Sequence, residues 1–447
     1  MRADERLSAL LLPVMYGMMG RPYQAMTREL QQNETLAEEA LAALQWKRLT
    51  TLLHHCYLHV PYYRAMFDEL GAHPDDIRTM ADYARLPILD KEMLKSHSTS
   101  LVASTHDPGR MHRVTTGGST GTPVQMYYDS RYFDWGWATL LRNISWTGHH
   151  PGERQAWVTR ESTGGLPRAL RLAIERKWVA GVVVQTPDTV AQWASHLARQ
   201  QPRLVYSTPS SRLPALASYL LEHDIHLDSV RAVMTSSETL LDETRLLIEE
   251  AFGAQVFDQY GSTECLSIAS ECASGSMHVN ADVNLVEYVP LDSAPDLSEL
   301  VITPLFNYGM PLLRYRLKDL GRMLPGRCDC GRTLPRMGRL VGRLTGTATL
   351  SDGTVLTPYA LEELVQGVPG IARFQFRQTS QDAFDLLVVR APHDQSGLDA
   401  ALGDIGRKFS EQNGPSVDFR VCYVDDIPLT SSGKHLYVVA LQDETPQ

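Results

Sequence analysis

The chain has 447 residues, which is too long for a single ordinary core, and its 43% hydrophobic and 21% charged residues are typical of a soluble globular protein with two or more domains. The formal net charge of −10 excludes a general nucleic-acid binder, which would carry basic patches, and no apolar run is long enough to span a membrane. Six unevenly spaced cysteines favour a reducing, cytoplasmic setting over a secreted disulfide scaffold.

Helices are predicted for the first hundred residues. Residues 7–20, LSALLLPVMYGMMG, are interpreted as an amphipathic first helix and not as a targeting segment, because Pro13 interrupts them and no Ala-x-Ala cleavage pattern follows. Residues 36–60 place apolar side chains three or four positions apart, which is the helical period. We therefore expect a helical lead-in over residues 1–100.

Residues 115–305 alternate short apolar runs with helical stretches, and this alternation predicts a layered α/β core. The Gly-, Arg- and Pro-rich stretch 321–346 predicts a domain boundary, followed by a smaller α+β segment. The predicted fold class is therefore α/β. It comprises a large N-terminal domain of mixed β-sheets flanked by helices over residues 1–342, and a small C-terminal domain over residues 343–447.

Residues 115–123, TTGGSTGTP, are a candidate phosphate-binding loop. Glycines let backbone N–H groups approach an anion closely, and the hydroxyl groups add further donors. The stretch is not the usual P-loop, because no Gly-Lys-Ser/Thr ending follows the first glycine at the required spacing. Taken alone, such a stretch is more often an ordinary polar turn, so its function depends on the rest of the chain.

Four further polar stretches follow in order. Ligands of open α/β sheets bind beyond the carboxyl ends of strands, where the first two of these stretches are expected. A carboxylate such as Glu264 among hydroxyl groups suits Mg²⁺, Asp319 can accept hydrogen bonds from ribose, and Lys434 can reach a phosphate or a carboxylate. The four stretches are TSSETL (235–240), DQYGSTE (258–264), LRYRLKDLG (313–321) and LTSSGKHLYV (429–438).

The five stretches, in this order, resemble the adenylate-forming superfamily of acyl-CoA synthetases and peptide-synthetase adenylation domains, and within it the phenylacetate–CoA ligase branch. The resemblance extends from HVPYYRAMFDELG (59–71) to PLTSSGK (428–434). It implies ATP-dependent activation of a small-molecule carboxylic acid, aryl or arylalkyl, as acyl-AMP with release of pyrophosphate. Transfer to the thiol of CoA or of carrier-protein phosphopantetheine would follow, with the C-terminal domain acting as a mobile lid.

The resemblance also implies roles for individual residues. The loop residues implied to contact the ATP β- and γ-phosphates are Thr115, Thr116, Gly117, Ser119, Thr120 and Gly121. The residues implied to surround the adenosine are Ser236, Ser237, Glu238, Tyr260, Gly261, Ser262, Asp319 and Arg343. The implied catalytic residues are Thr263 at the α-phosphate, Glu264 holding Mg²⁺, and Lys434 stabilising the adenylation transition state.

Two short Cys/His pairs predict a metal site beside the nucleotide motifs. Cys272 and His278 stand in ECASGSMH, and Cys328 and Cys330 stand in RCDCGR, so a zinc knuckle is expected within residues 272–330. Three thiolates and one imidazole form a tetrahedral shell that favours zinc. Four protein ligands leave no open position, so the predicted Zn²⁺ is structural. The alternative is four unrelated thiol and imidazole groups.

Several alternatives stay open at the level of sequence. The stretch GRLTG (342–346), which corresponds to the hinge between the two domains of the resembled family, carries Thr345 where relatives usually have an acidic residue. Thr122 of the candidate phosphate loop stands where many relatives have lysine. The group that accepts the acyl moiety is therefore left open: it is either a thiol, which would give a thioester, or an amine, which would give an amide. AMP transfer to a non-carboxylate and a non-enzymatic zinc-stabilised nucleotide-binding scaffold are further alternatives. The identity of the acid, a carrier-protein partner and a homodimer are also left open.

Overall fold

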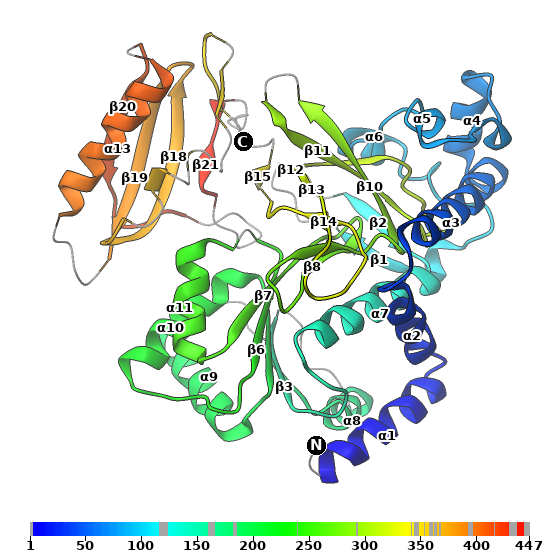
Figure 1. Cartoon of the computed structure of the whole chain (residues 1–447), viewed down its shortest axis with the longest axis horizontal. Coiled ribbons are helices and arrows are strands. Elements are labelled where there is room, and N and C mark those ends of the chain that lie inside the picture. Colours follow the sequence, from blue (N-terminus) through cyan, green and yellow to red (C-terminus); the bar gives the residue numbers. More distant parts are fainter. Residues whose placement is uncertain are drawn as a thin grey trace.

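The computed structural model describes most of the chain in two separately packed parts (Figure 1). The larger part contains a nine-stranded sheet, a four-stranded sheet, a two-stranded hairpin and most of the described helices. The smaller part contains the C-terminal four-stranded sheet, a short two-stranded pair and one long helix. The described residues are all except 1–2, 116–123, 160–165, 182–185, 239, 292–293, 341, 344–347, 353, 357–360, 362–363, 366–367, 392–396, 415, 429–435 and 442–447.

The chain begins with a run of helices. Helix α4 starts at Pro61, whose fixed φ suits the first helical turn, and helix α6 is capped by the Asp90 carboxylate, which accepts a hydrogen bond from the Met93 amide at 2.8 Å. No helix among the described residues is long and apolar enough to cross a bilayer. The helices are α1 (Ala3–Met18), α2 (Tyr23–Asn33), α3 (Glu38–His59), α4 (Pro61–Glu69), α5 (Met80–Tyr83) and α6 (Lys91–Ser96).

A nine-stranded sheet forms the centre of the larger part, in the order β13-β14-β9-β8-β7-β6-β5-β3-β4. Strands β4, β3, β5, β6 and β7 are neighbours and run parallel to one another. The remaining neighbours, from β7 through β8, β9 and β14 to β13, pair antiparallel. The strands are β3 (Gln155–Thr159), β4 (Lys177–Gly181), β5 (Leu204–Thr208), β6 (Ala232–Ser236), β7 (Gln255–Ser262), β8 (Leu266–Glu271), β9 (Met277–Val279), β13 (Met323–Leu324) and β14 (Arg336–Met337).

Helices cover both faces of this sheet, as the α/β pattern predicted (Figure 1). One face packs against α9, α10 and α11 through a core that includes Trp193, Leu216 and Ile248, and the other packs against α7 and α8 through Ile144 and Leu172. These helices are α7 (Ser130–Trp146), α8 (Leu166–Ile174), α9 (Pro187–Gln200), α10 (Leu213–Glu222) and α11 (Asp242–Phe252).

A second, antiparallel sheet lies beside the first and joins the N-terminal helices in the largest core. Its order is β10-β11-β12-β15, and a separate hairpin pairs β1 with β2. The strands are β1 (His112–Thr115), β2 (Gln125–Tyr128), β10 (Asn284–Leu291), β11 (Ala294–Pro304), β12 (Tyr315–Gly321) and β15 (Gly342–Arg343).

The C-terminal part has its own apolar core, which includes Phe376, Phe384 and Phe409. Its sheet has the order β20-β19-β18-β21, with helix α13 packed against it, and β16 pairs with β17. The predicted fold class, a large α/β part followed by a small α+β part, is confirmed. The elements are β16 (Ala348–Thr349), β17 (Val355–Leu356), β18 (Ile371–Ser380), β19 (Ala383–Arg390), α13 (Leu398–Asn413), β20 (Asp418–Tyr423) and β21 (Val438–Val439).

Candidate nucleotide site and metal centre

The loop after β6 lies beside the carboxyl ends of two parallel strands. Ser236 ends β6 and is in register with Gln259 of β7. Ser237 adopts a left-handed backbone with φ of +80°, and its hydroxyl group forms a 2.7 Å hydrogen bond with that of Thr208 at the end of β5. The Glu238 carboxylate accepts a hydrogen bond from the Ser211 amide at 2.9 Å. This predicted adenine-binding loop is therefore fixed to the strand ends by its own polar side chains.

The end of β7 joins the two sheets of the larger part. The Tyr260 hydroxyl donates a hydrogen bond to the Asp319 carboxylate on β12 at 2.7 Å, and both side chains are buried. Asp319 is also in register with Arg343 on β15. The structure thus brings together three residues that the sequence predicted for the adenosine site, although they lie far apart along the chain.

Gly261 is required by a close approach within the β7–β8 turn. A bulge interrupts the pairing after Tyr260, and a Cβ atom at position 261 would lie 2.4 Å from the Leu266 carbonyl oxygen. Any side chain at this position would clash with fixed backbone. The next residue, Ser262, closes the turn by accepting a hydrogen bond from the Cys265 amide at 3.0 Å.

Three tyrosines contact the turn that carries Thr263 and Glu264, and the sequence predicted a contact with this turn for none of them. The Tyr128 hydroxyl donates to the Thr263 carbonyl oxygen, and the Tyr132 hydroxyl donates to the Glu264 carbonyl oxygen at 3.3 Å. The Tyr315 hydroxyl lies 3.5 Å from the Glu264 carboxylate. Burial and, to a smaller extent, the negative charge of Glu264 raise the pKa of Tyr315 well above its ordinary value. This phenol therefore stays protonated and faces the carboxylate as a donor.

The candidate phosphate loop has a described stem. Thr115 ends β1 and pairs with Gln125 of β2, and β2 leads directly to Tyr128, which contacts the Glu264 turn. The hairpin therefore anchors the two ends of the loop close to the predicted Mg²⁺ ligand. The remaining predicted loop residues and the predicted catalytic lysine lie outside the described residues; they are Thr116, Gly117, Ser119, Thr120, Gly121 and Lys434.

The four predicted metal ligands converge. One ligand atom from each of Cys272, His278, Cys328 and Cys330 lies within 4.8 Å of all the others. The Cys272 and Cys328 sulfurs are 3.7 Å apart, and the Cys330 sulfur is 3.3 Å from the His278 Nε2. His278 Nδ1 lies 2.9 Å from the Leu334 carbonyl oxygen, so that nitrogen carries the proton and Nε2 faces the sulfurs. This donor set and spacing fit one tetrahedral zinc ion.

The Cys/His cluster is connected to the N-terminal helices by a largely buried ionic network that sequence patterns did not indicate. Arg332, two residues after Cys330, donates to the Glu34 carboxylate at 2.9 Å, and the Trp146 indole donates to the same carboxylate at 2.8 Å. Arg142, which is fully buried, donates to both oxygens of the Asp282 carboxylate at 2.7 and 3.0 Å. These contacts hold helix α7 against the segment that carries the ligands.

A pair of carboxylates beside the predicted adenine-binding loop was also not predicted from the sequence. The Asp258 amide donates to the Glu271 carboxylate at 2.8 Å, and the Thr235 hydroxyl donates to the Asp258 carboxylate at 2.9 Å. Burial and, to a smaller extent, the negative charge of Glu271 raise the pKa of Asp258 to about 7. Arg245 donates two hydrogen bonds of 2.8 and 2.9 Å to Glu271, and the raised pKa places the titration of Asp258 near neutral pH.

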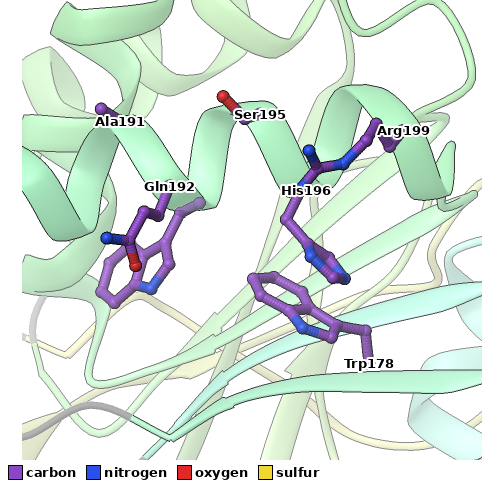
Figure 2. A pocket seen from close by; sticks show the side chains of 7 residues that line it. Trp178, Ala191, Gln192, Ser195, His196 and Arg199 are labelled. Carbon is purple, nitrogen blue, oxygen red and sulfur yellow. The ribbon is translucent and has the colours of Figure 1, made fainter.

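Two hollows among the described residues of the larger part bear on the candidate site. One is lined by aromatic and small residues of α7 and the β7–β8 turn, with Trp135 stacked on Phe306 at a ring separation of 4.2 Å, and it adjoins the Glu264 turn. The other lies between β4 and α9, where Trp178 stacks on His196 at 4.2 Å (Figure 2). This second hollow contains none of the predicted site residues.

Comparison with known proteins gives relatives over nearly the full length. No protein-family model matches the chain. It is 29% identical over 435 residues to the phenylacetate-coenzyme A ligase of Escherichia coli K12, covering 92% of this chain and 97% of that protein. It is 30% identical over 349 residues to the phenylacetate-coenzyme A ligase of Pseudomonas putida, covering 74% and 77%. Among solved structures, 2-hydroxyisobutyryl-CoA ligase in its postadenylation state superposes with a TM-score of 0.74 at 20% identity, covering 92% of each chain.

Proposed function

Because the chain belongs to the phenylacetate–CoA ligase family of adenylate-forming enzymes, we propose that it is an acid–thiol ligase that uses ATP and CoA with Mg²⁺. A carboxylate oxygen of the acid attacks the α-phosphorus of ATP, which forms acyl-AMP and releases pyrophosphate. The thiol then attacks the acyl carbon and displaces AMP. The observation that carries the assignment is the convergence of Tyr260, Asp319 and the Glu264 turn at one edge of the two sheets.

Adenosine is proposed to bind between the β6 loop and β12. Asp319 would accept hydrogen bonds from the ribose hydroxyls, while the Tyr260 ring would lie against the adenine. The hydrogen bond between these two residues supports this assignment, because it fixes the carboxylate and the ring relative to one another before the nucleotide arrives. Ser237 and Glu238 would contact the edge of the base from the strand ends.

The phosphates are proposed to bind at the turn after β7. Glu264 is the carboxylate available to hold Mg²⁺, which would neutralise charge on the phosphate oxygens when bound. Thr263 would donate to the α-phosphate, and the β1–β2 hairpin would deliver the loop to the β- and γ-phosphates. Lys434, proposed to stabilise the charge that develops at phosphorus, stays a prediction from sequence.

The acid is proposed to be aryl or arylalkyl and to bind beside the Glu264 turn, where the lining side chains would move apart to admit it, because the hollow there measures only about 10 Å³ in this structure. Its lining by Tyr132, Trp135 and Phe306 supports a flat apolar substrate. Gly136 faces this space closely, since a Cβ atom there would lie 2.3 Å from the Leu266 side chain. A larger residue at position 136 would therefore force the Leu266 side chain to move.

The Cys272, His278, Cys328 and Cys330 cluster is proposed to bind a structural zinc ion. The pKa of the Cys328 thiol, which burial would raise, is brought down to about 6 by hydrogen bonds from Ser276 and the Cys330 backbone, and this supports a thiolate ligand. All four ligands come from the protein, so no position is left for a substrate. The proposed role is to hold the β9 and β14 region together.

The test is pyrophosphate release with ATP, Mg²⁺ and a panel of aryl, aliphatic and amino acids, with hydroxylamine present to trap acyl-AMP. We expect release that depends on an aryl acid, together with the corresponding hydroxamate. A second stage replaces hydroxylamine with CoA, a phosphopantetheinylated carrier protein or an amine. A thioester of CoA is expected, whereas an amide alone would favour the amide-forming alternative. If no acid of the panel causes pyrophosphate release, AMP transfer to a non-carboxylate or a non-enzymatic nucleotide-binding scaffold would be favoured.

A further inference from the structure

A buried polar cluster forms one wall of the hollow beside the Glu264 turn. Its centre is Ser267 on β8, which lines the hollow. The Ser267 hydroxyl oxygen accepts hydrogen bonds from the carboxamide groups of Asn143, Gln259 and Asn280 at 2.8, 2.8 and 3.1 Å. None of these four residues is more than 7% exposed. Buried polar atoms in folded proteins are nearly always hydrogen-bonded, so each atom of the cluster requires a partner.

The hydrogen bonds of the cluster do not balance. A hydroxyl oxygen accepts two hydrogen bonds and donates one, whereas Ser267 faces three carboxamide groups. The orientation of Asn280 is fixed, because its oxygen accepts a hydrogen bond from the buried Arg142 at 2.7 Å. The Asn143 Oδ1 and Gln259 Oε1 atoms have no partner among the described residues. Rotating either carboxamide lets its oxygen accept the Ser267 proton, but the oxygen of the other carboxamide still lacks a partner.

The cluster and the Glu264 turn lie at opposite ends of one row of α7 side chains. Tyr132 contacts that turn, and Thr139 lines the hollow about two helical turns further along. Asn143 continues the row, because residues four positions apart lie above one another on a helix. Trp135, which also lines the hollow, adds an indole N–H that has no partner in the described part of the chain. An acid with its carboxylate at the Glu264 turn would therefore point its ring substituents towards the carboxamide groups.

We propose that the activated acid carries a hydrogen-bond donor on its aromatic ring, a hydroxyl or an amino group, which donates to the unpaired carboxamide oxygen of Asn143 or Gln259. This inference rests on the proposed function, because it requires the acid to bind beside the Glu264 turn. A ring without such a donor would cover the oxygen and shield it from water, at a cost in free energy that a donor would recover. The site would therefore select substituted aryl acids over analogues that lack the donor.

A single buried water molecule is the alternative partner for the unpaired oxygen. The hollow has a volume of only about 10 Å³, which is close to the space that one water needs. Leu266 is the lining side chain that would make room for a ring, because it is only partly buried and extends over Gly136. A ring that displaced such a water without replacing its hydrogen bond would lose affinity, whereas a water that stayed in place would leave the site indifferent to the substituent.

The first test compares the dissociation constants of matched acids for the full chain, measured by isothermal titration calorimetry. The protein is saturated with Mg²⁺ and α,β-methylene-ATP, which cannot release pyrophosphate, so binding is observed without turnover. The acids are benzoate, phenylacetate and their meta- and para-substituted hydroxy, amino and methyl derivatives. We expect the best hydroxy or amino acid to bind about 10-fold to 100-fold more tightly than the methyl acid of the same shape. Equal or weaker binding, or no binding of any hydroxy or amino acid, would overturn the proposal.

Two variants test which groups cause the preference. Asn143→Leu and Gln259→Met each remove one carboxamide with little change in volume, and the remaining carboxamide is then free to accept the Ser267 proton. The affinity ratio between the donor-bearing acid and the methyl acid should therefore fall to near one in both variants. Thr139→Val is the matched control, because Thr139 lines the hollow but its hydroxyl group already donates to the Trp135 carbonyl oxygen at 2.8 Å, so the ratio should persist. A ratio retained in both carboxamide variants would contradict the proposal.

Pyrophosphate release with the same acids separates this inference from the proposed function. Selective binding without release would support the inference and refute the ligase activity. Release with the methyl acid at a kcat/KM equal to that of the hydroxy and amino acids would support the ligase activity and refute the inference. These comparisons use the wild-type protein, so they decide the question even if a carboxamide variant fails to fold.

Discussion

The hydrogen bond between Tyr260 and Asp319 gives the sharpest test of the nucleotide site. In Tyr260→Phe the ring stays, but the 2.7 Å donor to a buried carboxylate is lost. A hydrogen bond to a charged group contributes about 1.5–3 kcal/mol, and the Asp319 carboxylate that loses this donor is buried away from water. We therefore expect the free energy of unfolding to fall by about 1–3 kcal/mol. If the bond also orients Asp319 for ribose, the Kd for ATP should rise by about 10-fold, with about 150-fold as the upper limit.

The assays are urea denaturation for the free energy of unfolding and isothermal titration calorimetry for the Kd of ATP. Tyr288→Phe is the matched control, because the buried Tyr288 hydroxyl on β10 has no hydrogen-bond partner among the described residues. Its removal should change neither quantity appreciably. A fall in stability with an unchanged Kd for ATP would make the Tyr260–Asp319 contact purely structural. If Tyr260→Phe matched Tyr288→Phe in both assays, the energetic reasoning itself would be refuted.

Three further predictions concern other parts of the molecule. Lys434→Ala should abolish acid-dependent pyrophosphate release while sparing the reaction of presynthesised acyl-AMP with CoA; equal loss of both half-reactions would contradict its assigned role. Cys330→Ser should remove the bound zinc, measured by metal analysis of the purified protein, and should lower the midpoint of thermal unfolding, whereas an unchanged zinc content would exclude the proposed shell. The pKa of Asp258 rises from 3.8 to about 7 on folding, so folding takes up a proton between these values and stability falls as pH rises through that window. Asp258→Asn lacks this titration, so its thermal midpoint relative to the wild type should increase from pH 5 to pH 8, and a pH-independent difference would show that Asp258 titrates normally.

The fold class and the family could be predicted from sequence because they rest on local patterns. The alternation of apolar strands and helices is a short-range periodicity, and the nucleotide motifs fall at strand ends that this periodicity places. Gly261 is an example, since its small size is needed for an approach to Leu266 only five residues away. The order of five motifs along the chain identified the phenylacetate–CoA ligase branch.

Contacts between distant segments could not be predicted in the same way. Tyr128 and Tyr132 contact the Glu264 turn from more than 130 positions away, and Arg142 binds Asp282 from 140 positions away. Nothing in the local sequence distinguishes these side chains from ordinary core residues. Their partners are chosen by the packing of α7 and β2 against the sheets, so only the tertiary structure identifies them.

The amino-acid sequence determined the residue types of the proposed zinc site, and the strand order decided that they meet. Cys272 follows β8 and His278 lies on β9, while β14 pairs with β9 and brings the segment carrying Cys328 and Cys330 beside them. Helix α1 is a second example, because its sequence places apolar residues on all sides of the helix. Which side is buried depends on where the helix docks, because burial is a property of the packed molecule and not of the helix alone.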